Sequence, residues 1–408
     1  MSLATTTYST RSGRDRHTVV GATTIRARHT LTLDEALRTV PSPIIPSKVW
    51  LMPIQSDSRP ATTDATVSIV IPTRNRLPFL REAVASVQAQ TFGRWELLIV
   101  DDASDDETPG WLGSISDGRI RVLRMERPIE RSSARNKGLA AVRGEYVTFL
   151  DDDDRLRPTA LEVLAGALSR RGGAVACGAR IEFDADGHRR RAPHVRHAQT
   201  RALWPEVLGG WVAGPGEVIF RTDALRSIGG WDEAVLPGVE DWELLLRSAY
   251  RLGPVSLDPR PVREWRKHPA QWTPEDAEEA LTSITEAFLA SLPPAERAVG
   301  EGAARLRTLF QEAQIALHTH EDPASALRLF REAYRAAPDV ARSPMFRARF
   351  ARGISQALVG RAVGRGAQRL LEASRRSLLR RLRLAPGQRY PRATGPPANV
   401  DDDMPEGG

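Results

Sequence analysis

Strand-like apolar runs alternate with helix-like segments in the first half of the chain, and this alternation most restricts the possible fold. Residues 67–73 read VSIVIPT and residues 95–102 read WELLIVDD, both nearly continuous apolar runs. Between them, residues 77–90 repeat apolar side chains at helical spacing. Buried parallel strands carry apolar side chains on both faces, and helices connect such strands. The pattern predicts an α/β fold with a Rossmann-like, mostly parallel central sheet and helices on both faces.

Acidic residues follow two of the expected strands. Asp101 and Asp102 end one strand, and four aspartates, 151–154, end another in the stretch YVTFLDDDD. Open α/β sheets bind ligands at the carboxyl edge of their strands, and hard divalent cations prefer carboxylate oxygens. The sequence therefore favours a metal site for a diphosphate. The alternative is that the aspartates cap the next helix, and we expect Asp154 to do so, with Pro158 in the first helical turn.

Composition limits the class of protein. The chain has 408 residues, of which 41% are hydrophobic, so it can form a core with an appendage. A single cysteine, Cys177, excludes a disulfide framework and favours a reducing compartment. The polar N-terminus shows no signal peptide, and no apolar run is long enough to span a bilayer. These features predict a cytoplasmic protein.

The positive charge is concentrated near the C-terminus. The net charge is +7, and residues 342–383 contain twelve arginines and one acidic residue. Apolar residues at helical spacing between these arginines predict peripheral contact with an anionic membrane, at its inner face. A solvated arginine-rich helix explains the pattern about as well. The segment lacks interleaved aromatic residues, which argues against nucleic-acid binding.

Changes in composition divide the chain into four parts. Residues 1–66 are expected to be a weakly ordered leader, 67–273 the α/β domain, 274–385 an α-helical extension, and 386–408 a disordered tail. In the extension, Ala326, Phe330, Ala333 and Pro338 have the spacing of one tetratricopeptide-like hairpin. An ordinary helical hairpin fits the same spacing.

Five blocks, in order and in register, resemble the family 2 glycosyltransferases of GT-A fold. They read VSIVIPTRNR, AQTFGRWELLIVDDASDDET, ARNKGLAAVRGEYVTFLDDDD, GGWDE and EDWELLLR, over roughly residues 66–273. The resemblance implies a GT-A domain with a DXD motif and a divalent metal, Mn²⁺ or Mg²⁺. It implies inverting transfer of a sugar from a nucleotide-diphosphate sugar, with UDP favoured, to an acceptor hydroxyl. The acceptor would be a glycan, a lipid-linked intermediate or a peptide, and synthesis of cell-envelope or extracellular glycan is favoured.

The resemblance also implies a set of donor-binding residues. A loop after the first strand would line the base, Asp102 and its companion would contact the nucleoside, and the ARN block would lie beside the diphosphate, with Arg131 as a rival. The implied set is Pro72, Thr73, Asn75, Asp101, Asp102, Arg135, Asn136, Asp151 and Asp152. For Thr73 and Asn75 the alternative is a simple turn after the strand.

Metal and base residues are implied in the same way. Asp153 would ligate the metal with Asp151, and His268 is a further candidate ligand. Asp241 matches the catalytic base, with Glu240 as its neighbour, although both could simply cap the following helix. A helix N-terminus would lower the pKa of such a carboxyl group. Arg266, in the same segment as His268, is expected to close over the diphosphate, and Trp231 and Trp242 to stack on sugars or to lie in the core.

Three alternatives to this function remain. A peptide or protein glycosyltransferase that binds its acceptor through the helical extension would share every catalytic residue. A sugar-phosphate nucleotidyltransferase usually has a glycine-rich nucleotide loop, whereas IPTRNRLPF contains no glycine. A binding module without activity fits poorly with Asp102, Asp153 and Asp241 being present together. The sequence also lacks transmembrane helices and a Gln-x-x-Arg-Trp motif, which argues against a processive membrane synthase.

Overall fold

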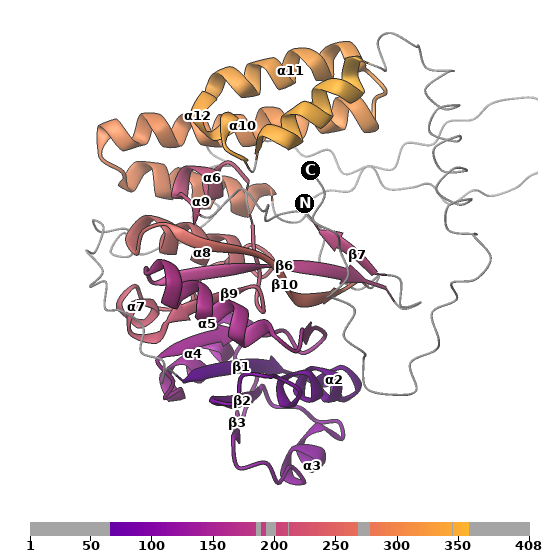
Figure 1. The fold of residues 1–408 in the computed structure, drawn as a ribbon, viewed down its shortest axis with the longest axis vertical. Helices are drawn as coiled ribbons and strands as arrows, with labels where there is room; N and C mark the ends of the chain where they lie inside the picture. The colour runs from indigo at the N-terminus through magenta and orange to yellow at the C-terminus, as the bar shows by residue number, and fades with distance from the viewer. Residues whose placement is uncertain are drawn as a thin grey trace, which may run out of the picture. The chain divides into compact units, whose positions relative to one another are not determined.

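The computed structural model describes residues 66–184, 189–192, 201–210, 212–267, 278–344 and 346–358 (Figure 1). All of them belong to one of the chain's two compact units, Ile45–Gly408. The expected leader before residue 66, the candidate ligand His268, most of the basic C-terminal segment and the tail lie outside the described residues.

A mixed sheet with a parallel half forms the centre of the fold. Its strand order is β3-β2-β1-β4-β9-β6-β10-β5. The first half is parallel and consists of β3 (Ile120–Arg124), β2 (Trp95–Asp101), β1 (Val67–Thr73) and β4 (Tyr146–Phe149). The second half contains β9 (Val218–Arg221), β6 (Val175–Phe183), β10 (Val255–Arg266), β5 (Arg155–Leu156), β7 (Arg189–Ala192) and β8 (Arg201–Ala202). Here only β6 and β10 are parallel to each other, while β9 lies antiparallel between β4 and β6. The expected α/β class with a mostly parallel sheet is confirmed.

Helices cover both faces of the sheet, as the apolar runs require. Alternate residues of β1 enter different cores: Ile69 and Ile71 pack with α2 (Leu77–Gln88) and α5 (Ala160–Arg171). Val70 packs with α4 (Arg131–Ala141) and α8 (Glu240–Arg251) on the other face. A β-carbon on Gly138 of α4 would lie 2.3 Å from Val70 Cγ1, so glycine lets this helix approach the strand.

The C-terminal part of the described chain is helical, as expected. It comprises α9 (Glu278–Ser291), α10 (Pro294–His318), α11 (Pro323–Ala336), α12 (Pro338–Arg342) and a further helical stretch over residues 346–358. Short helices α3 (Thr108–Gly113), α6 (Trp204–Leu208) and α7 (Thr222–Ser227) connect strands of the sheet. Ala326, Phe330 and Ala333 are buried along one side of α11, facing the aromatic core of this region. Among the described helices, none combines the length and apolarity that a bilayer crossing requires.

The extension packs against the α/β domain through α6 and α8. Arg307 of α10 places its guanidinium 4.8 Å from the Trp242 ring centroid and donates to Thr285 Oγ1 at 2.8 Å and to the Leu208 carbonyl at 3.4 Å. Trp242 in turn donates from Nε1 to the Val207 carbonyl at 2.9 Å. The helix that begins with Glu240 and Asp241 is therefore in contact with the extension.

Candidate active site

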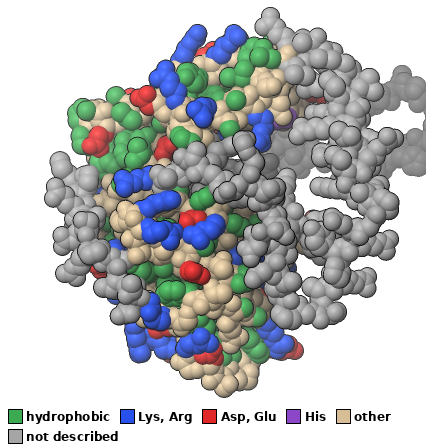
Figure 2. All heavy atoms as spheres, viewed as in Figure 1, with side chains coloured by type: hydrophobic (Ala, Val, Ile, Leu, Met, Phe, Trp, Pro, Cys, Tyr) green, Lys and Arg blue, Asp and Glu red, His purple; other side chains and the backbone are tan. Residues whose placement is uncertain are grey.

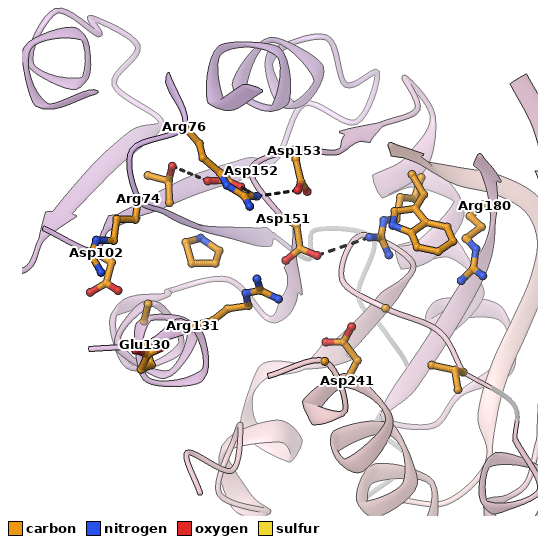
Figure 3. Close-up of a pocket in the computed structure, with 18 residues that line it drawn as sticks. Arg74, Arg76, Asp102, Glu130, Arg131, Asp151, Asp152, Asp153, Arg180 and Asp241 are labelled. Atoms are coloured by element: carbon orange, nitrogen blue, oxygen red, sulfur yellow. Dashed lines mark hydrogen bonds and ion pairs between the residues drawn. The ribbon is translucent and has the colours of Figure 1, made fainter. Parts of the chain in front are cut away.

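A cavity of about 570 Å³ opens at the carboxyl edge of β1 and β4 (Figure 3). Charged side chains of both signs dominate its lining, with few apolar groups. The lining residues are Pro72, Thr73, Arg74, Arg76, Asp102, Glu130, Arg131, Ala134, Asp151, Asp152, Asp153, Arg180, Val212, Gly214, Gly238, Asp241, Arg263 and Trp265. Both predicted carboxylate clusters thus reach one cavity, together with Asp241 from the other half of the sequence.

Arginines of the chain itself neutralise much of the aspartate cluster. Arg76 Nη1 lies 2.8 Å from Asp153 Oδ2 and 3.2 Å from Asp152 Oδ1, while Thr73 Oγ1 donates to Asp152 Oδ2 at 2.8 Å. Arg135, which is fully buried, contacts Asp151 Oδ1 at 2.7 Å. The repulsion within the run of aspartates is therefore offset before any metal binds.

These arginines set different proton affinities within the cluster. Burial raises the pKa of Asp151, but Arg135, Arg131 and other guanidiniums outweigh burial and bring that pKa down to about 2. Burial raises the pKa of Asp152 to about 6 against the opposing effect of Arg76. Asp151 therefore stays ionised at neutral pH and can serve as a cation ligand.

Asp154 is not the helix cap that the sequence suggested. Helix α5 begins at Ala160, its N-cap is Thr159, and no side chain caps it. Asp154 is instead fully buried, where both Nε and Nη2 of Arg263 donate to it and the Arg266 amide donates to Oδ1 at 2.8 Å. A buried carboxylate requires such a partner, and Arg263 on distant β10 supplies it.

Asp241 faces the cavity with a carboxyl group that is incompletely engaged. Its side chain is 29% exposed, and Oδ1 has no hydrogen-bond partner among the described residues, although Arg135 Nη1 lies 3.7 Å away. Burial, followed by repulsion from the Glu240 carboxylate, raises the pKa of Asp241 to about 8. This shift is opposite to the one expected from the helix N-terminus. A carboxyl group with a pKa near neutrality suits proton transfer.

Glu240 lies behind Asp241 rather than in the cavity. It is 2% exposed, accepts from the Gly238 amide, and lies 3.1 Å from Arg135 Nη1 and 3.5 Å from Arg131 Nη1. The Glu240 carboxylate therefore fixes the Arg135 guanidinium, which also pairs with Asp151.

Several residues of the implied donor set do not line the cavity. Asn75 adopts a left-handed φ of 53° and exchanges two hydrogen bonds with Asp105, at 2.6 and 2.9 Å. Asp101 is fully buried and pairs with Arg124 at 3.0 Å. Asn136 bonds to the backbone of Trp231 at both its amide atoms. These residues shape the loops, whereas Pro72, Thr73, Asp102 and Asp151–Asp153 line the cavity itself.

Asp102 reaches the cavity from the end of β2. Its Oδ1 accepts from the Ile129 amide at 2.7 Å, which fixes the carboxylate at the cavity edge. Trp231 and Trp242, considered as sugar platforms, are instead buried core residues that do not line the cavity.

Sequence reasoning missed Arg180, Arg263 and Trp265, which β6 and β10 contribute to the lining of the cavity. Arg266, which was expected to close over the diphosphate, does not line the cavity; it pairs with Glu82 at 2.6 Å and donates to the Asp153 carbonyl at 2.8 Å. Side chains of a strand alternate between the two faces of the sheet. In the sequence REWR, residues 263–266, this alternation places Arg263 and Trp265 on one face and Arg266 on the other. Arg180 on β6 had no comparable signal.

Carboxylate oxygens of Asp151, Asp153 and Asp154 lie within 4.8 Å of one another. Oxygen donors at this spacing suit Mg²⁺ or Mn²⁺. Asp154 is already enclosed by Arg263, so Asp151 and Asp153, which line the cavity, are the two that could hold a metal.

Comparisons with known proteins indicate the family of this α/β domain. Residues 68–228 match the model of the family described as Glycosyl transferase family 2. This segment is a family 2 glycosyltransferase domain.

Two curated relatives and one solved structure illustrate the similarity. The O-antigen biosynthesis protein RfbC of Myxococcus xanthus is 34% identical over 189 residues, covering 44% of this chain and 14% of RfbC. A UDP-Glc:α-D-GlcNAc-diphosphoundecaprenol β-1,3-glucosyltransferase of Escherichia coli, WfgD, is 38% identical over 91 residues, covering 22% of this chain and 36% of WfgD. The chain thus spans well under half the length of either relative.

The structure of S. aureus TarS residues 1–349 in complex with UDP-GlcNAc superposes with a TM-score of 0.51. The match is 20% identical in sequence and covers 72% of this chain and 89% of that chain. At this identity the likeness shows the GT-A-like fold alone.

Proposed function

We propose that this chain is an inverting glycosyltransferase that transfers a sugar from a nucleotide-diphosphate sugar, with UDP favoured, to an acceptor hydroxyl. The observation that carries the proposal is a single cavity that joins Asp102, the pair Asp151 and Asp153, and Asp241 with its unbonded oxygen. Such a cavity offers a nucleoside contact, a cation site and a base in one place.

The donor would lie along the carboxyl edge of β1, β2 and β4. The nucleoside would contact Asp102 and the loop that contains Pro72 and Thr73. The diphosphate would lie toward Asp151 and Asp153, where Arg76 and Arg131 supply cationic groups. A divalent cation held by the two aspartates would offset the negative charge that develops on the leaving nucleoside diphosphate.

Asp241 would act as the general base. As the acceptor oxygen forms its bond to the anomeric carbon, the proton of that hydroxyl passes to the Asp241 carboxylate, and the bond to the diphosphate oxygen breaks. A single displacement of this kind inverts the anomeric configuration. Arg135 would position Asp151 and, through Glu240, the start of α8.

We place the reaction in cell-envelope or extracellular glycan synthesis, at the cytoplasmic face of the inner membrane. Both curated relatives are named for glycan synthesis, and one is named for a diphosphoundecaprenol-linked acceptor. Arg328, Arg331 and Arg335 are exposed on α11, and Figure 2 shows basic side chains gathered over this helical region. These charges support peripheral contact with an anionic membrane. No contact of the described extension favours a peptide acceptor.

The test is a thermal-shift screen of nucleoside diphosphates and nucleotide sugars, with Mn²⁺ or Mg²⁺ and then with chelator. We expect metal-dependent stabilisation by a uridine nucleotide, because a ligand at about 100 times its Kd adds about 2.7 kcal/mol. The shift should disappear in Asp153→Ala and persist in Asp223→Ala, an exposed aspartate of α7 outside the cavity. Absence of any nucleotide-dependent shift, or an unchanged shift in Asp153→Ala, would contradict the proposed donor site.

A further inference from the structure

A cationic and aromatic cluster forms the end of the cavity that the proposed mechanism leaves unused. It consists of Arg180 and Trp265, which line the cavity, and of Lys267, which contacts Trp265 outside the lining. The Arg180 guanidinium lies 4.5 Å from the Trp265 ring centroid, and Lys267 Nζ lies 3.7 Å from the same centroid. Figure 3 shows Arg180 across the cavity from Asp102, with Asp151 and Asp241 between them. The cluster therefore lies beyond the proposed base as seen from the nucleoside end.

Arg180 shares its carboxylate partner with a second arginine. Arg180 is 21% exposed and pairs at 3.3 Å with Glu217, a fully buried carboxylate that Arg263 shares at 3.0 Å. Arg263 also pairs with Asp154, and its Nη2 lies 3.6 Å from Asp151 Oδ2. Arg180 therefore shares Glu217 with a second cation, and Arg180 Nε has no hydrogen-bond partner among the described residues.

The loop before β9 brings backbone close to the base at this end. A β-carbon on Gly214 would lie 3.2 Å from Asp241 Oδ2 and 2.7 Å from Arg263 Nη1. Glycine therefore keeps the space between the cluster and Asp241 open. A molecule that reached Asp241 past this loop would pass Arg180 and Trp265, which both line the cavity.

We propose that Arg180 and Trp265, with Lys267 beside them, form an acceptor subsite for a sugar that carries a negative charge close to the attacking hydroxyl. The inference rests on the proposed function, because in-line displacement requires the acceptor to approach from the side opposite the leaving diphosphate. Guanidinium groups bind carboxylate and phosphate oxygens through charge-assisted hydrogen bonds, and Trp265 lines the cavity beside Arg180. The shared chemistry is an anionic glycan, whose charge comes from either a phosphate or a carboxylate.

The experiment measures binding of three matched glycosides to the full chain saturated with UDP and Mn²⁺. The probes are methyl β-D-glucopyranoside, its 6-phosphate and methyl β-D-glucuronide, titrated by calorimetry. We expect at least one anionic probe to bind about tenfold more tightly than the neutral one, the size of effect that one charge-assisted hydrogen bond produces. The stronger of the two anionic probes identifies phosphate or carboxylate as the source of the charge.

Variants assign the preference to this cluster. Arg180→Gln should reduce the preference to less than about threefold without changing the affinity for UDP, and Arg180→Lys should retain most of it. The control is Arg221→Gln on neighbouring β9, because Arg221 likewise pairs with one carboxylate, Glu145 at 3.0 Å, and lies over one aromatic ring, yet does not line the cavity. The preference of the Arg221→Gln variant for the anionic probes should match that of the unmodified protein.

The outcomes separate this inference from the proposed function. If the protein binds UDP but binds all three probes with equal affinity, or binds none of them, the anionic subsite is contradicted and the donor site is not. An equal loss of preference in Arg180→Gln and Arg221→Gln also overturns it. If UDP itself does not bind, the proposed function fails and the subsite fails with it.

Discussion

The two sides of the cavity are built in different ways. The donor side comes from the ends of β1, β2 and β4, where polar residues directly follow buried strands. The opposite side collects one or two residues each from β6, β10, the loop before β9 and the first turn of α8. Yet each side supplies charges that the other requires. Arg263 of β10 pairs with Asp154, and Arg135 of α4 pairs both with Asp151 and with Glu240 of α8. The donor side is thus stable as an acidic cluster only when the distant half has folded against it.

The largest expected effect separates chemistry from donor binding. Asp241→Asn keeps the shape of the side chain but removes the proton acceptor, so kcat should fall by about two to four powers of ten while the Kd for UDP stays unchanged. In the unmodified protein, kcat/KM should rise with pH to a plateau above about 8, because the raised pKa of Asp241 delays formation of the ionised base. The residual activity of the variant should lack this rise. A loss smaller than about threefold would remove Asp241 from the mechanism.

The next effect tests whether the two sides share their charges. Arg263→Met leaves Asp154 and Glu217 buried without their guanidinium, which should lower the free energy of unfolding by about 3–5 kcal/mol. The loss should be smaller at pH 5 than at pH 8, because burial raises the pKa of Asp154 to about 7 and protonation neutralises this carboxyl group at the lower pH. Denaturant unfolding at both pH values measures this. Arg260→Met is the control, since Arg260 is 54% exposed on the same strand and its ion pair should contribute below about 1 kcal/mol. Equal effects of the two substitutions would contradict the shared-charge description.

The smallest expected effect concerns the helical extension. Burial lowers the pKa of Arg307 to about 10, and no carboxylate pairs with this residue in the part of the chain that the structure describes. Arg307→Met should lower stability by about 1 kcal/mol through the lost contact with Trp242 and its hydrogen bonds.

Because Arg307 holds the end of α6 and the start of the loop that carries Val212 and Gly214, its loss should also raise the acceptor KM by up to about fivefold without changing UDP affinity. Steady-state kinetics with varied acceptor measures the effect. Arg305→Met, exposed on the same helix, should change neither quantity. A rise in the UDP Kd instead would place the effect of the extension on the donor side.

The sequence predicted the donor side well because its signals are local. A buried strand that ends in carboxylates directs them to one edge of a parallel sheet wherever the rest of the chain lies. Asp102, Asp151, Asp152 and Asp153 were all expected at such an edge, and all line the cavity. Asn75 and Asn136 belong to the same motifs, but their hydrogen bonds to Asp105 and Trp231 fix loops instead. Motif membership alone does not tell a lining residue from one that supports the loop.

By itself, the sequence determined the α/β class, the positions of the first four strands along the chain and the carboxylate edge, because hydrophobic periodicity and strand ends are properties of short segments. Tertiary structure alone decided which charges meet: Arg263 rather than a helix N-terminus binds Asp154, and Arg180 lies across the cavity from Asp102. It also decided that the pKa of Asp241 rises, since burial and the neighbouring Glu240 outweigh the helix dipole. Coulomb energies and desolvation depend on distances between residues far apart in the chain, and only the folded molecule sets those distances.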